Sequence, residues 1–267
     1  MSIPGLWQRA REAWRTEGAG RAEPILRQLV DLQRTSPDGL PSDLHEARLS
    51  LAHCLFEQQR PAESLELERL VLTESERREG PLAERTLEAL HAMGASLLEL
   101  GRLEEADTSA RDMLARCEAI GDAAHPLTAP ALRLGGLVAE ARGDAARSEA
   151  LHRRRYEREV QLAPREERRL RNFARHWGWS LVNLRRPEAA RGAFALACPS
   201  PSEAPPAVAL GLAFCTALET GDDAPVHVLL EDCRASGRLD AVVIDQAERR
   251  LQQLRTPTVE PGERPQR

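Results

Sequence analysis

Few of the residues that could do chemistry are spaced as a catalytic or metal site requires. The five cysteines are far apart and form no CxxC pair, so we interpret them as small core residues rather than as disulfides or metal ligands. His45-Glu46 has no second histidine four residues on, which excludes the zinc-protease helix motif. A glycine-rich phosphate loop, a GxSxG elbow and a Cys–His pattern are also missing. We therefore expect no catalytic residues, no metal and no cofactor.

Arginine supplies every basic charge, since the chain has no lysine. Many arginines lie between positions 147 and 171, with glutamates interleaved. Opposite charges three or four residues apart on a helix explain most of this run as a solvated face. The alternative is a surface for an acidic partner or nucleic acid. The net charge of −5 argues against a dedicated nucleic-acid-binding protein, so we expect no nucleic-acid partner.

The composition favours helices. Of the 267 residues, 42% are apolar but only 3% are aromatic, and the strong helix formers Ala, Leu, Glu and Arg dominate. A β-sandwich or barrel normally has more aromatic and β-branched residues. No apolar run is long enough to span a membrane, and the segment 1–14 lacks the pattern of a signal peptide. We therefore expect a cytoplasmic protein without a membrane partner.

The elements that would position any site repeat along the chain. Small residues recur at an interval of 42 (94 − 52, 136 − 94 and 178 − 136), and a second small residue follows each of them by twelve. The first set is Ala52, Gly94, Gly136 and Gly178, and the second is Ser64, Ala106, Ser148 and Ala190. A turn lies between the two positions each time. Periods of roughly 20–50 residues are typical of solenoids, so the repeat predicts an all-α stack of helix pairs.

Small residues let two antiparallel helices approach closely, and we expect the first-helix residue to face the second-helix one. Pro61 and Pro187 fit the first position of second helices, where the missing N–H costs nothing. Weaker pairs are expected at 7–34 and 208–235, with a capping helix at 238–254. We predict one domain over 1–255, with its clearest repeats at 43–198, and a disordered tail at 256–267.

The segment 97–106, with its G-R-x-x-E-A turn, resembles the core of a tetratricopeptide repeat (TPR). The usual repeat has about 34 residues. The longer repeat here is similar to those of kinesin light chain and its bacterial relatives, whose Gly and His-Pro linker is matched by the segment 120–126. The resemblance implies a right-handed superhelix of about five to six helix pairs plus the capping helix. His152 and Arg155 depart from it, because apolar residues are expected there; that repeat is either distorted or presents a surface to a partner.

In such families the first helices line a concave groove that binds peptides. The resemblance places groove positions three residues before, one after and five after the small residue. The candidates for partner binding are His91, Arg133, Arg175, Trp179, Asn183, Glu57 and Glu99.

Each candidate has a chemical role and a structural alternative. The two arginines could hold a carboxylate, Asn183 could bind a peptide backbone and Trp179 could anchor an apolar side chain. Alternatively, the arginines pair with local glutamates and Trp179 belongs to the core.

The resemblance implies a non-catalytic bacterial scaffold or adaptor that binds a protein or peptide partner. One alternative is a regulatory sensor of a small peptide or ligand, although the segment 1–40 is too short and not basic enough for a convincing DNA-binding domain. The other alternative is a helical enzyme, which a closed pocket with convergent polar groups would favour over an open groove.

Overall fold

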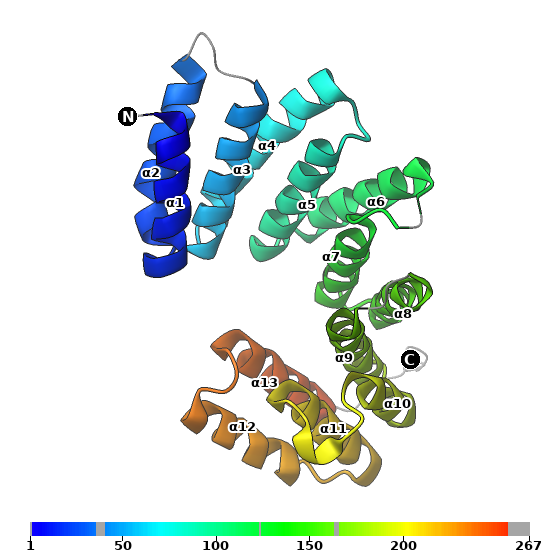
Figure 1. Ribbon diagram of the computed structural model, residues 1–267. Coiled ribbons are helices and arrows are strands. Elements are labelled where there is room, and N and C mark those ends of the chain that lie inside the picture. Colours follow the sequence, from blue (N-terminus) through cyan, green and yellow to red (C-terminus); the bar gives the residue numbers. More distant parts are fainter. Residues whose placement is uncertain (1, 36–40, 123, 163–165, 256–267) are drawn as a thin grey trace, which may run out of the picture. The chain divides into compact units, whose positions relative to one another are not determined.

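The computed structural model describes residues 2–35, 41–122, 124–162 and 166–255. These residues form helices joined by short turns, with no strand among them (Figure 1). The predicted all-α fold is confirmed. The helices are α1 (Ile3–Glu17), α2 (Ala19–Thr35), α3 (Pro41–Glu57), α4 (Pro61–Glu79), α5 (Glu84–Glu99), α6 (Leu103–Ile120), α7 (Thr128–Ala141), α8 (Ala145–Gln161), α9 (Glu167–Asn183), α10 (Pro187–Ala197), the 3-10 turn η1 (Pro201–Glu203), α11 (Pro206–Thr220), α12 (Ala224–Ser236) and α13 (Ala241–Arg255).

The chain divides into two compact units, Met1–Asp144 and Ala145–Arg267. Within unit 1 each helix from α1 to α7 packs against the next, and α5 also contacts α3 and α7. Within unit 2 the same holds from α8 to α13, and α9 also contacts α11. Each unit is therefore a stack of consecutively packed helices, in which first helices also meet from α3 to α7 and between α9 and α11. The single domain expected over 1–255 stays a prediction, and the predicted tail lies outside the described residues.

The repeat found in the sequence is visible in how the first helices end. Helices α3, α5, α7 and α9 end at positions 57, 99, 141 and 183, which keeps the interval of the small residues (99 − 57, 141 − 99 and 183 − 141). Two residues later the backbone is left-handed each time. The residues are Gln59 (φ 60°), Gly101 (φ 69°), Gly143 (φ 77°) and Arg185 (φ 54°).

The backbone hydrogen bonds at these turns repeat with the same interval. The amides at positions 60, 102, 144 and 186 donate to the carbonyls at positions 55, 97, 139 and 181. This is the Schellman arrangement, in which otherwise unpaired carbonyls at a helix end find donors. Pro61 and Pro187 then begin α4 and α10, as predicted.

The small residues of the repeat are buried, and at one position the two of them are in direct contact. The Ser64 hydroxyl does donate to the Ala52 carbonyl at 2.7 Å. A Cβ added at Gly94, however, would lie 2.5 Å from Leu134 Cδ2, and one added at Gly178 would lie 2.6 Å from Phe194 Cε1. The atom nearest to the added Cβ belongs to a larger side chain at both glycines, so these positions make room for Leu134 and Phe194, and their facing the small residue twelve positions on stays a prediction.

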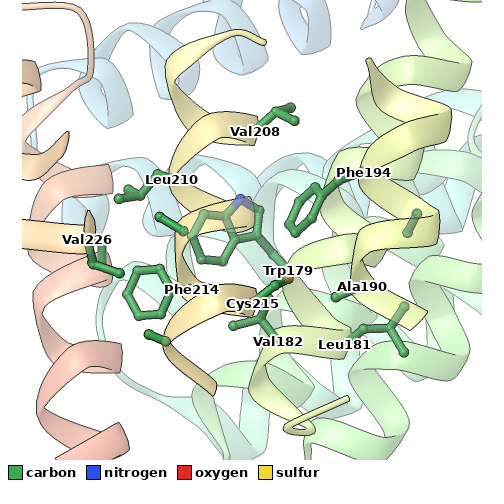
Figure 2. Packing of buried hydrophobic residues seen from close by; sticks show 14 of the residues in the cluster. Trp179, Leu181, Val182, Ala190, Phe194, Val208, Leu210, Phe214, Cys215 and Val226 are labelled. Atoms are coloured by element: carbon green, nitrogen blue, oxygen red, sulfur yellow. The ribbon is translucent and has the colours of Figure 1, made fainter. Parts of the chain in front are cut away.

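The core of unit 2 is built around three aromatic side chains (Figure 2). Trp179 of α9 meets Phe194 of α10 and Phe214 of α11 edge-on, with ring centroids 5.9 and 5.5 Å away. Aliphatic side chains from α11, α12 and α13 complete the cluster. The predicted C-terminal pair and capping helix are thus present, and α13 belongs to this core.

The seam between α8 and α9 is polar. His152 stacks on His176 with ring centroids 5.7 Å apart, and the Arg155 guanidinium lies 3.6 Å from the centroid of Phe173. Both His152 and Arg155 are buried. The unusual residues of this repeat therefore pack against α9 within unit 2. The predicted solvated face is wrong for these two residues and for Glu149 and Glu159, which are also buried, whereas exposed members of the run do form salt bridges, for example Arg171 with Glu167 at 3.2 Å.

No helix in the described ranges is both long enough and apolar enough to span a bilayer.

Candidate partner-binding pocket

A pocket of about 820 Å³ lies in unit 1. Its walls come from the first helices α1, α3, α5 and α7, and α4 contributes to its floor. The stacking of pairs explains this composition, because the groove positions of successive first helices fall side by side. The walls are mixed, with aromatic and aliphatic side chains between carboxylates, histidines and arginines.

Three of the predicted partner-binding residues line this pocket: His91, Arg133 and Glu99. The repeat register accounts for their meeting, since His91 and Arg133 hold the position three before the small residue on α5 and α7. Glu57 does not line the pocket. Glu57 accepts a hydrogen bond from the Trp14 indole at 2.8 Å, and Trp14 itself lines the pocket.

Arg133 has a positive charge that the protein does not neutralise. Its guanidinium makes no hydrogen bond or ion pair with another described residue. The Arg133 side chain is accessible from the pocket that it lines. The surrounding helices nevertheless desolvate the guanidinium in part, which lowers its pKa. Burial, helped by the neighbouring Arg133 charge, also lowers the pKa of His91. Its lowered pKa favours neutral His91 at pH 7, so Arg133 is more strongly cationic than His91.

Carboxylates gather on the wall formed by α3 and α5. Glu46 and Glu88 both line the pocket, and their charges interact unfavourably. Burial and the nearby Glu84 raise the pKa of Glu88, against a smaller opposing effect of Arg85. Arg85 itself pairs with Glu79, 3.3 Å away. The pocket thus has acidic groups on α3 and α5 and the cationic Arg133 on α7.

The floor holds a buried carboxyl group that the sequence analysis missed. Glu68 of α4 is 2% exposed, and its Oε1 accepts hydrogen bonds from the hydroxyls of Ser64 at 2.7 Å and Ser96 at 2.9 Å. Its Oε2 has no partner among the described residues. Burial raises the pKa of Glu68 despite these hydroxyls. The available signal was the spacing of Ser64 and Glu68, which puts both on the buried face of one helix.

The three candidates in unit 2 are placed differently. The Arg175 guanidinium donates to Asn172 Oδ1 at 2.7 Å. Trp179 is 9% exposed, and the Arg250 guanidinium of α13 lies 4.9 Å from the centroid of its ring. Asn183 Oδ1 accepts a hydrogen bond from Arg250 Nε at 2.9 Å. Helix α13 thus covers two of these residues, and partner binding by any of the three stays a prediction.

Within the part of the chain that the structure describes, no three His, Cys, Asp or Glu side chains converge as metal ligands would. The five cysteines are free thiols, of which only Cys198 is partly exposed. The absence of metals and cofactors stays a prediction from the sequence.

The chain matches no family model and no curated protein. Its fold matches several solved structures. A putative kinesin light chain with TPR-like repeats from Podosopora anserina is 15% identical, with a TM-score of 0.62 over 73% of this chain and 92% of that one. PilF of Pseudomonas aeruginosa is 14% identical, with a TM-score of 0.58 over 92% and 96%. The Rap conjugation gene regulator of plasmid pLS20, solved with the Phr* peptide, is 13% identical, with a TM-score of 0.63 over 92% and 72%. Together with the regularly repeated helix pairs, these likenesses show that the protein is a TPR-like helical-repeat protein.

Proposed function

We propose that the protein is a non-catalytic scaffold or adaptor that binds a peptide or protein partner along its first helices, with the pocket of unit 1 as a principal contact. The observation that carries this proposal is Arg133, a partly desolvated guanidinium with no anion of its own in an open pocket. Removing a charge from water is unfavourable unless another group compensates it. A carboxylate of the partner supplies that compensation.

The geometry of arginine suits this role. A guanidinium can donate two parallel hydrogen bonds to a carboxylate, whether that group is a side chain or a chain terminus. The apolar side chains of the same pocket, including Leu49, Phe56 and Leu137, provide surface for the rest of the partner. The Rap regulator of similar fold was solved with a peptide, which supports a peptide as the class of partner.

The openness of the site supports binding rather than catalysis. The polar groups of the pocket come from four helices, and no nucleophile is paired with a base among its described lining residues. The cytoplasmic location and bacterial origin expected from the sequence stay predictions.

Affinity capture from lysate with identification by mass spectrometry tests the proposal. The wild type is compared with Arg133→Gln and with Arg78→Gln, which removes an exposed arginine of α4 outside the pocket. A charge-assisted hydrogen bond is worth about 1.5–3 kcal/mol, so Arg133→Gln should weaken capture of specific partners about tenfold or more.

Folding of both variants is checked by circular dichroism. If a folded Arg133→Gln protein captures the same partners at the same yield as Arg78→Gln, the pocket is not the binding site.

A further inference from the structure

We propose that the pocket of unit 1 selects partner segments that carry an arginine or lysine side chain, which binds at Glu46 and Glu88 while an anionic group of the same partner binds Arg133. The inference rests on the proposed function, because it specifies the chemistry of the partner that the same pocket would take. It is carried by charge complementarity and by the buried carboxyl group on the floor.

Carboxylates outnumber the available cations on the walls. Glu46, Glu88 and Glu99 line the pocket with accessible side chains. Glu88 and Glu99 form no hydrogen bond or salt bridge with another described residue, and Glu46 has only a long contact of 3.8 Å with the exposed Arg11. Of the two arginines in the walls, Arg85 is already paired with Glu79 outside the pocket. The pocket therefore attracts a cation more strongly than a second anion.

The acidic wall is also under electrostatic strain in the unbound protein. Glu88 is close enough to Glu84 and Glu46 for their like charges to disfavour its ionised form. A guanidinium or ammonium group between Glu46 and Glu88 would remove that repulsion. Such a group gains two hydrogen-bond acceptors, since neither carboxylate is fully used within the protein.

Glu68 is an independent indication that a polar group enters the pocket. A buried oxygen without a hydrogen bond is costly, and such atoms are uncommon in folded proteins. The Ser64 hydroxyl cannot satisfy the carboxyl group alone, because its single proton is shared between Glu68 Oε1 and the Ala52 carbonyl. Glu68 lines the same pocket as Glu46 and Glu88, and a donor group of a partner would supply the hydrogen bond that its Oε2 lacks.

The other walls fit the rest of a basic side chain. The rings of Trp14 and Phe56 and the side chain of Leu98 present apolar surface beside the carboxylates. The methylene stem of an arginine or lysine packs on such surface while its charged end reaches polar groups. An aromatic face near the cation adds a further attraction.

The test is a selection of random dodecapeptides displayed on phage, with the full-length protein as bait. We expect arginine and lysine to be enriched at one position of the selected peptides. The binding of the most enriched synthetic peptide, and of its version with glutamine at that position, is then measured by fluorescence anisotropy. Four proteins are compared first: the wild type, Glu88→Gln, Glu46→Gln and Glu66→Gln, the last removing an exposed α4 carboxylate outside the pocket. Arg133→Gln is then measured with the same peptides.

The expected result is specific to the acidic wall. Glu88→Gln weakens binding of the basic peptide about tenfold, as expected for a charged hydrogen bond, and Glu46→Gln weakens it by a similar factor. Glu66→Gln leaves it unchanged. The glutamine peptide binds all four proteins with the same low affinity.

Two other outcomes overturn the inference in different ways. Enriched peptides without a basic residue, whose binding still needs Arg133, refute the cation site and leave the proposed function standing. Enriched peptides that bind the wild type and Arg133→Gln equally, or no enrichment over an unrelated bait, contradict both.

Discussion

Replacing Gln59 by glycine should stabilise the protein. Gln59 occupies the left-handed turn after α3 with φ at 60°, the place that Gly101 and Gly143 hold after α5 and α7. A side chain on Cβ is unfavourable in this conformation, whereas glycine adopts it freely. The Gln59 side chain is exposed and makes no hydrogen bond with another described residue, so its loss removes no contact.

The size of the effect is the difference between two terms. A non-glycine residue in the left-handed region costs about 1–2 kcal/mol. Glycine costs about 0.4–1 kcal/mol through the greater freedom of the unfolded chain. The free energy of unfolding of Gln59→Gly should therefore rise by roughly 0.5–1 kcal/mol. For a chain of this size that is about 1–4 °C in melting temperature.

Urea unfolding followed by circular dichroism measures the change, with Gln59→Ala as the matched control. Alanine removes the same side-chain atoms but keeps the unfavourable φ, so it should give no gain. Arg185→Gly has a smaller net effect, because Arg185 also donates to the Gln253 carbonyl at 3.0 Å. If Gln59→Gly is no more stable than Gln59→Ala, the turn geometry does not carry the cost that we assign to it.

Two further substitutions test the packing and the electrostatics. Gly178→Ala should lower the free energy of unfolding by about 1–3 kcal/mol, since its Cβ would overlap the fully buried Phe194 ring. The double variant with Phe194→Leu should lose less stability than the sum of the two single variants. Additive losses in urea unfolding would contradict the contact. Because burial raises the pKa of Glu68, the folded protein is stabilised by its neutral form at low pH and loses that stability as the pH rises above 4.5 towards the higher folded pKa. Glu68→Gln should accordingly match the wild type at pH 4 but exceed it by about 1–2 kcal/mol at pH 8; an equal difference at both pH values would show that the charge of Glu68 is not responsible.

The fold was predictable because its signal is periodic. The interval of 42 between Ala52, Gly94, Gly136 and Gly178 located the helix pairs, and the same interval separates the helix ends and their Schellman turns. The wall positions of the pocket followed from the same register. His91 and Arg133 come together because neighbouring first helices repeat the same geometry.

The features that escaped prediction depend on contacts between distant positions. Trp179 and Asn183 hold groove positions in the register, but Arg250, which belongs to the last helix of the chain, lies against both. A periodic pattern contains no information on how a non-repeating C-terminal helix packs. Glu68 escaped for another reason. It lies on a second helix, where a glutamate is expected to be exposed to solvent unless the hydroxyls of Ser64 and Ser96 are known to contact it.

The local character of the helix contacts has a mechanical consequence. Within each unit the main contacts of a helix are with its neighbours in sequence and with the next first helix. A pulling force on the two ends is therefore resisted by one interface at a time, and unfolding under load should proceed in steps. At roughly 3.4 Å per residue, the unfolding of one repeat releases roughly 140 Å of chain, so each step should lengthen the protein by an amount of this order.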